Sequence, residues 1–149
     1  GHDASGELSE RHDPETHLLP LIMQAARGDR ENISIFGTDY NTEDGTCIRD
    51  YIHVDDLCAA HLNGLNMLFN PENKISSNDF NLGNGSGFSV KEVISKVKIL
   101  TSKDFVVLEK DRRSGDPAVL IASNIKASKT LNFTPDKSKI EDIIKSLID

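Results

Sequence analysis

The sequence is poor in several residue types, and each shortage disfavours a class of protein. It contains two cysteines, no tryptophan, and 17 Lys and Arg residues against 24 Asp and Glu residues in 149 positions. Two cysteines are too few for a disulfide framework, and Cys47 and Cys58 lack the Cys-x-x-Cys spacing of zinc and redox sites. The net charge of −7 disfavours a broad basic surface for nucleic acid or anionic lipid. An anionic ligand would therefore need a local cluster of cationic side chains.

Long apolar runs are also absent. The longest stretches, such as Leu18–Met23, are far shorter than the roughly 20 residues of a membrane-spanning helix. No basic-then-apolar leader opens the chain. We therefore expect neither a membrane nor a nucleic-acid partner, and a cytoplasmic location. With 37% hydrophobic and 28% charged residues, the composition is typical of one soluble globular domain.

Helix-like and strand-like patterns alternate along the chain, which predicts an α/β fold. Apolar residues at helical spacing predict helices over 16–28, 57–68, 89–100 and 138–147. Short β-prone runs predict strands at 34–36, 51–54, 80–82, 105–108 and 119–122. Asp55 and the Ser-x-x-Glu pairs that begin at Ser89 and Ser138 predict the starts of three of these helices.

A glycine-rich turn is the first candidate for a binding site. Gly83, Gly85 and Gly87 follow a predicted strand and precede a predicted helix, as in a dinucleotide-binding turn. Phe88, however, occupies the place of the third glycine of that motif. A tight strand-to-helix connection is therefore the better interpretation.

Three arginines in two predicted loops are the second candidate. Arg49, Arg112 and Arg113 could converge on a phosphate, because guanidinium presents forked donors that match phosphate oxygens. An arginine pair in a loop is more often solvated, so this pattern alone does not establish a phosphate site. Pro14 interrupts the polar residues over 12–17, so no helical i, i+4 pair presents two metal ligands on one face, and an exposed loop is a better interpretation than a metal site there.

Five segments occur in the order and with the residues of one enzyme family: His12–Leu18, Ile35–Tyr40, Asp44–Val54, Phe80–Gly85 and Arg112–Asp116. Together they resemble the C-terminal part of bacterial UDP-glucose 4-epimerases, members of the extended short-chain dehydrogenase/reductase family. The most specific of the five is the segment from position 44 to 54. The resemblance implies that residues 1–149 form a single α/β domain, the substrate-binding portion of that fold without its main Rossmann sheet.

The same resemblance implies an absent half. In this family the N-terminal half carries the Gly-rich NAD turn and a catalytic Tyr-x-x-x-Lys pair. The only tyrosines here are Tyr40 and Tyr51, and Asp44 and Asp55 stand where each lysine would be. We therefore expect that NAD serves the full-length family but does not bind this chain, that the chain alone is inactive, and that it self-associates through surfaces that the other half normally covers.

Residues near the predicted first helix and first strand acquire binding roles through the resemblance. It implies that His17 and Leu18 lie along the nucleotide. It also implies that Ser34, Ile35 and Phe36 line the uracil through their backbone groups. These five residues come from two segments that lie close together in the sequence.

The remaining roles implied by the resemblance fall in the middle and later parts of the chain. Arg49 and Arg113 would bind the diphosphate, and Asp116 would contact the ribose. Leu120 would border the sugar, at a position where some members of the family carry tyrosine. Tyr51 falls in a matched motif, where we expect structural support rather than chemistry.

The function implied is that of the UDP-sugar-binding region of an NAD-dependent enzyme of galactose metabolism. The whole enzyme would interconvert UDP-glucose and UDP-galactose by oxidation at C4, rotation of the keto sugar and re-reduction. One alternative is the C-terminal part of a nucleotide-sugar dehydratase or decarboxylase. Another is a non-catalytic module that binds a nucleotide sugar. The preference between plain and N-acetylated hexoses stays open.

Overall fold

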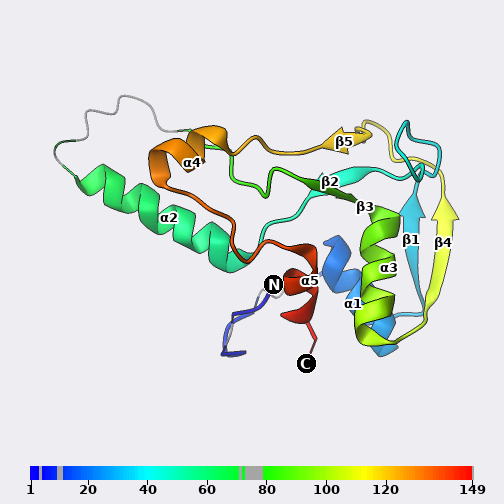
Figure 1. Cartoon of the computed structure of the whole chain (residues 1–149). Helices are drawn as coiled ribbons and strands as arrows, with labels where there is room; N and C mark the ends of the chain where they lie inside the picture. Colours follow the sequence, from blue (N-terminus) through cyan, green and yellow to red (C-terminus); the bar gives the residue numbers. More distant parts are fainter. Residues whose placement is uncertain (4, 10–11, 71, 73–78, 149) are drawn as a thin grey trace.

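The computed structural model describes residues 1–3, 5–9, 12–70, 72 and 79–148. Helices and strands alternate along the chain, which confirms the α/β prediction (Figure 1). In order they are α1 (Leu18–Arg27), β1 (Asn32–Phe36), β2 (Ile48–Asp50), α2 (Val54–Phe69), β3 (Gly87–Ser89), α3 (Val90–Thr101), β4 (Val106–Lys110), β5 (Val119–Leu120), α4 (Ile125–Leu131) and α5 (Ile140–Lys145).

Two small sheets are formed by the described residues. β1 and β4 pair in parallel, with Asn32 opposite Val106 and Phe36 opposite Lys110. The second sheet has the order β3-β2-β5, in which β2 pairs antiparallel with β3 and parallel with β5. Neither sheet is the wide parallel sheet of a dinucleotide-binding domain. The structure therefore has the small-sheet architecture expected of a C-terminal portion.

The main core lies between α1, α3 and α5, on the side of the two sheets where these helices gather (Figure 1). Its side chains without solvent exposure include Ile22, Val93 and Ile140. α1 ends at Gly28, whose φ of 84° supplies the left-handed conformation of a helix C-cap. α3 begins with the predicted capping box: the Ser89 hydroxyl accepts from the Glu92 amide at 3.0 Å, and the Glu92 carboxylate accepts from the Ser89 amide at 2.7 Å.

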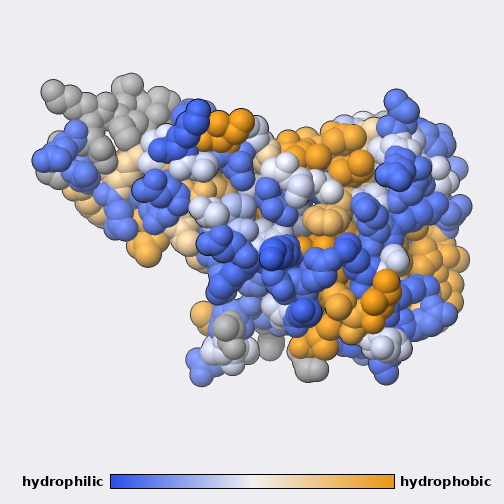
Figure 2. All heavy atoms as spheres, in the orientation of Figure 1, coloured by the Kyte–Doolittle hydropathy of each residue, from blue (hydrophilic) through white to orange (hydrophobic). Residues whose placement is uncertain are grey.

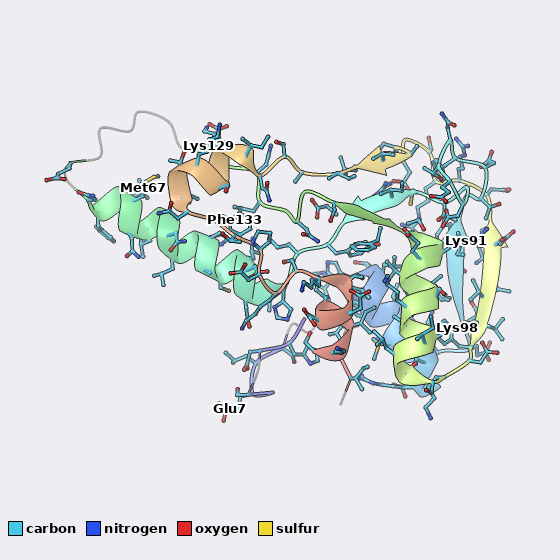
Figure 3. The ribbon with its side chains drawn as sticks, viewed as in Figure 1. Glu7, Met67, Lys91, Lys98, Lys129 and Phe133 are labelled. Atoms are coloured by element: carbon cyan, nitrogen blue, oxygen red, sulfur yellow. The ribbon has the colours of Figure 1, made fainter. Side chains whose placement is uncertain are left out.

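A second, smaller core joins α2 to α4 in an arm that extends away from the main core (Figure 1). Figure 3 shows Met67 on α2 and Phe133, just after α4, on the facing sides of these helices. The other face of α2 carries several exposed apolar side chains. Its exposed side chains are Leu62, Leu65, Leu68 and Phe69.

The start of α2 differs from its sequence-based prediction. The strand predicted at 51–54 is wrong, because the paired residues are Ile48–Asp50 and α2 already begins at Val54. Asp55 is not the N-cap. That place belongs to His53, whose Nδ1 accepts from the Asp55 amide at 3.1 Å. An imidazole nitrogen thus satisfies one of the free amides of the first turn.

Two predictions in the second half of the chain are also wrong. Residues 80–82 form no strand, because they pair with no strand among the described residues, and the pairing with β2 is made by Gly87–Ser89. Ser138 does not cap α5, since its hydroxyl donates to Asp56 Oδ2 at 2.5 Å and accepts from the His53 amide at 2.9 Å. The short helix α4 was not predicted at all. The strands expected at 105–108 and 119–122 are confirmed with shifted or shorter bounds.

Candidate functional site

A cavity of about 380 Å³ opens beside α1 and β1 and extends to β2 and the segment that follows β4. Residues far apart in the sequence meet in its wall. Six of the nine residues with predicted binding roles line it: Leu18, Ser34, Phe36, Arg49, Arg113 and Asp116. The fold therefore brings most of the predicted site together.

The wall of this cavity is cationic, although the protein is acidic. Arg30, Arg49, Lys110 and Arg113 line it, against the single carboxylate of Asp116 among the described lining residues. Arg49 forms an ion pair with Asp116 and also donates to the Ile48 carbonyl at 2.7 Å. In the described ranges the other three cations have no carboxylate partner. Unpaired cations around a cavity favour an anionic ligand.

Phe36 provides an aromatic surface between these charges. The guanidinium carbon of Arg113 lies 4.0 Å from the centre of the Phe36 ring, and the Lys110 ammonium lies 6.0 Å from it. Stacking restrains the guanidinium before any ligand binds. β1 itself is an edge strand, because β4 is its only partner within the described part of the chain. Backbone donors and acceptors on its other edge are therefore free of sheet pairing.

Arg112 does not join the other two arginines, so the three do not converge as their positions in the sequence would have allowed. Its Nε donates to Asp39 Oδ1 at 2.6 Å, and its guanidinium lies 4.1 Å from the centre of the Tyr40 ring. Gly37 makes this packing possible: its φ is 88°, and a Cβ there would collide with Tyr40 and Arg112. Arg112 therefore fastens the loop after β1 and does not point into the cavity.

Neither tyrosine suits the role of a catalytic base. Burial raises the pKa of Tyr51 to about 12, so this phenol stays protonated. The Tyr40 hydroxyl is buried without a hydrogen-bond partner among the described residues, and burial also raises its pKa. Burial raises the pKa of the Cys47 thiol as well, although Arg49 opposes the shift. Proton transfer at neutral pH needs a group with a lower pKa than these.

The glycine-rich turn does not fit NAD. The carboxylate of Asp50 accepts from the amides of Asn84 at 2.9 Å, Gly85 at 3.3 Å and Ala122 at 3.1 Å. A carboxylate thus occupies the amides that would have to cradle a pyrophosphate, and it would repel one. The turn leads into β3 instead of directly into a helix. This turn therefore does not offer the free amides that a dinucleotide pyrophosphate would need.

Three predicted residues lie outside the cavity wall. His17 pairs with Glu15 at 2.8 Å and faces a neighbouring cavity of about 300 Å³, which shares Leu18 and Tyr51 with the first. Ile35 is buried in the main core, so only its backbone can meet a ligand. Leu120 is 60% exposed on β5, opposite Arg49 in the parallel ladder.

Sequence reasoning missed two of the four cations, Arg30 and Lys110. Lys110 enters the wall because β4 pairs with β1. Arg30 lies just before β1, and its Nε donates to the carbonyl of Asn32, the first residue of that strand, at 2.8 Å. No local motif marks either residue. Within the described ranges, no group of three or more His, Cys, Asp or Glu side chains could hold a metal ion. No helix in that part is long and apolar enough to cross a membrane.

Comparisons with known proteins show the family of this chain and support its fold. Residues 4–83 match the model of the NAD dependent epimerase/dehydratase family. A UDP-glucose 4-epimerase of Halalkalibacterium halodurans is 48% identical over 145 residues, which are 97% of this chain and 42% of that protein. The solved UDP-glucose 4-epimerase from Brucella ovis, in complex with NAD, is 42% identical with a TM-score of 0.88, over 97% of this chain and 43% of that one.

A third relative is a solved UDP-glucose-4-epimerase from Stenotrophomonas maltophila with bound NAD and formylated UDP-arabinopyranose. It is 34% identical with a TM-score of 0.84, over 92% of this chain and 40% of that one. The chain thus spans about two fifths of the length of the relatives it matches. The family model covers more than half of its residues. The chain therefore belongs to the NAD dependent epimerase/dehydratase family.

Proposed function

We propose that this chain is the UDP-sugar-binding part of an NAD-dependent UDP-glucose 4-epimerase, an isomerase that interconverts UDP-glucose and UDP-galactose. The observation that carries the proposal is the cavity wall, which contains three cations without a carboxylate partner among the described residues, together with Phe36 and the Arg49–Asp116 pair. The similarity to UDP-glucose 4-epimerases supports the choice of ligand. A cytoplasmic role in galactose metabolism is part of the same proposal.

In this proposal the diphosphate lies between Arg49 and Arg113. Forked guanidinium donors can each bind two phosphate oxygens, and both side chains are already positioned, one by Asp116 and the other by Phe36. Asp116 keeps acceptor oxygens for the ribose hydroxyls. Preorganised donors reduce the conformational entropy lost on binding.

The nucleobase lies along β1. Ser34 and Phe36 line the cavity, and the free backbone edge of the strand can hydrogen-bond the carbonyl and N–H groups of uracil. Leu18 and His17 flank the nucleotide from the start of α1. Leu120 borders the hexose, since its neighbour across the ladder is Arg49.

Hydride transfer belongs to the rest of a longer protein, which supplies NAD chemistry and a base. The amides of the glycine-rich turn are taken by Asp50, and the pKa values of Tyr51 and Tyr40 are both raised, which supports this proposal. We therefore propose that the chain alone does not turn over UDP-galactose. A coupled assay of glucose-nucleotide formation checks this, and measurable turnover would contradict it.

Calorimetric titration with UDP tests the binding proposal. Replacing Arg113 with Ala removes an unpaired guanidinium from the wall and should weaken UDP binding about tenfold, the effect of one solvent-accessible charge-assisted hydrogen bond. Arg112→Ala is the matched control, because it removes the same charge one residue earlier. The Arg112 side chain contacts Asp39 and Tyr40 and does not line the cavity. This variant should leave UDP affinity within about twofold. Equal losses in both variants, or no UDP binding by the wild type, would contradict the proposal.

A further inference from the structure

Lys110 stands at a distinct place in the cavity wall, beside the surface on which the nucleobase would lie. It is the last residue of β4 and the direct partner of Phe36 in the parallel ladder. Its carbonyl accepts from the Gly37 amide at 2.8 Å, which fixes its backbone where the chain leaves β1. Parallel partners project to the same face of a sheet, so the side chains of Lys110 and Phe36 lie together. The 6.0 Å between the ammonium and the ring agrees with this.

Nothing among the described residues neutralises this ammonium. The preceding residue, Glu109, points to the opposite face of β4 and pairs with Lys91 of α3 at 3.4 Å. Asp116, the carboxylate in the cavity wall, is held by Arg49. Lys110 therefore presents an available cationic donor to the cavity at its Phe36 end.

An ammonium group only donates hydrogen bonds, and this property distinguishes between pyrimidines. Uracil carries carbonyl oxygens on both sides of its N3–H. Cytosine replaces the carbonyl at position 4 with an amino group, which is also a donor. A lysine beside that edge gains a charge-assisted hydrogen bond with uracil and meets an unfavourable donor with cytosine.

We propose that Lys110 is a specificity residue of the nucleotide site, whose ammonium donates to the carbonyl at position 4 of the base beside Phe36 and so favours uridine over cytidine nucleotides. The inference rests on the proposed function, which places the nucleobase along β1. It assigns Arg49 and Arg113 to the diphosphate and Lys110 to the base. Different side chains thus bind the diphosphate and recognise the base.

Titration of this 149-residue chain with UDP and with CDP, at one ionic strength, tests whether Lys110 recognises the base and not the diphosphate. The wild type should bind UDP more tightly than CDP. Lys110→Met keeps the length of the side chain beside Phe36 and removes the donor, and it should lower the UDP-to-CDP affinity ratio about fivefold by weakening UDP without weakening CDP. Lys110→Arg retains a donor-only cation and should preserve the sign of the preference.

Lys91→Met is the matched control. Lys91 projects from α3, as Figure 3 shows, and it does not line the cavity, so its loss removes one nearby positive charge without touching the base. Its UDP-to-CDP ratio should match the wild type. An equal loss of UDP and CDP affinity in Lys110→Met would overturn the inference, because Lys110 would then serve the phosphates. An unchanged ratio with tight UDP binding would also overturn it and leave the proposed function standing, whereas absence of UDP binding by the wild type would overturn both.

Discussion

The carboxylate of Asp44 fastens the loop between β1 and β2 to the start of α3. Its Oδ1 accepts from the Thr46 amide at 2.8 Å and from the Thr46 hydroxyl at 2.7 Å, and its Oδ2 accepts from the Ser89 hydroxyl. Thr46 and Ser89 are both buried. Asp44→Asn replaces one acceptor oxygen with an amide donor. That donor must then face a group of Thr46 or Ser89 that donates to the carboxylate in the wild type.

The expected loss follows from these three hydrogen bonds. A hydrogen bond to a charged group contributes about 1.5–3 kcal/mol, and a neutral one about 1 kcal/mol. Asp44 is half-buried, so we expect Asn to lower the free energy of unfolding by about 2 kcal/mol, which is about 4–8 °C in Tm at this chain length. Glu43→Gln removes the same charge one residue earlier, on an exposed side chain, and should cost less than about 0.5 kcal/mol.

The pH dependence gives a sharper form of this prediction. Burial alone would raise the pKa of Asp44, but hydrogen bonds from Ser89 and Thr46 outweigh it and lower the pKa below its ordinary value of 3.8. The unfolded chain therefore binds this proton more tightly than the folded one. The stabilisation is complete above that ordinary value and is lost as the pH falls through the folded pKa.

Urea unfolding followed by circular dichroism, at pH 7 and in steps down to pH 3, measures the effect. The difference between wild type and Asp44→Asn should be largest at pH 7 and should shrink in the acid steps. A difference that is constant across this range would refute the reasoning. So would a pH 7 effect as small as that of Glu43→Gln.

Two further predictions concern apolar surface. We expect the chain to self-associate through the exposed apolar face of α2. In sedimentation velocity, Leu65→Glu should therefore shift the chain towards the monomer. A wild type that is monomeric at high concentration would contradict this. Figure 2 shows more apolar surface over β5, which contains Leu120. In a longer enzyme that includes the N-terminal half, Leu120→Tyr should lower kcat/KM for UDP-N-acetylglucosamine about tenfold or more relative to UDP-glucose, because a phenol would fill the space for the acetamido group. Equal ratios in both enzymes would show that Leu120 does not border the sugar.

The end of α1 and the start of α3 were predicted correctly from local signals. The capping box of α3 and the glycine after α1 depend on residues within a few positions of each other, so the sequence pattern suffices. Ser138 shows the limit of such signals. It has the spacing of a cap, yet its hydroxyl is taken by Asp56, 82 residues earlier. A distant partner competes with the local one, and only the fold decides between them.

The residues of the candidate site likewise include some that the sequence predicted and some that it did not. Arg49, Arg113 and Asp116 were found through their motifs, and the fold brings them to one cavity. Arg112 was grouped with them because it is adjacent in sequence, but its partner Asp39 lies 73 residues away. Lys110 was missed because its place in the cavity wall depends on the pairing of β4 with β1. Side chains placed by long-range pairing have no signature in a short window of sequence.

The two separate cores described above have a consequence for local opening of the chain. The arm of α2 and α4 buries few side chains, and one of its links to the main core is Ser138, which also accepts from the Asn84 side chain at 2.7 Å through its carbonyl. Such a unit opens at a lower free energy than the core around α1 and α3. A ligand suppresses only those openings that destroy its site. If the cavity binds a nucleotide as proposed, we expect its occupancy to slow amide exchange around α1 and β1 and to leave exchange in the arm unchanged.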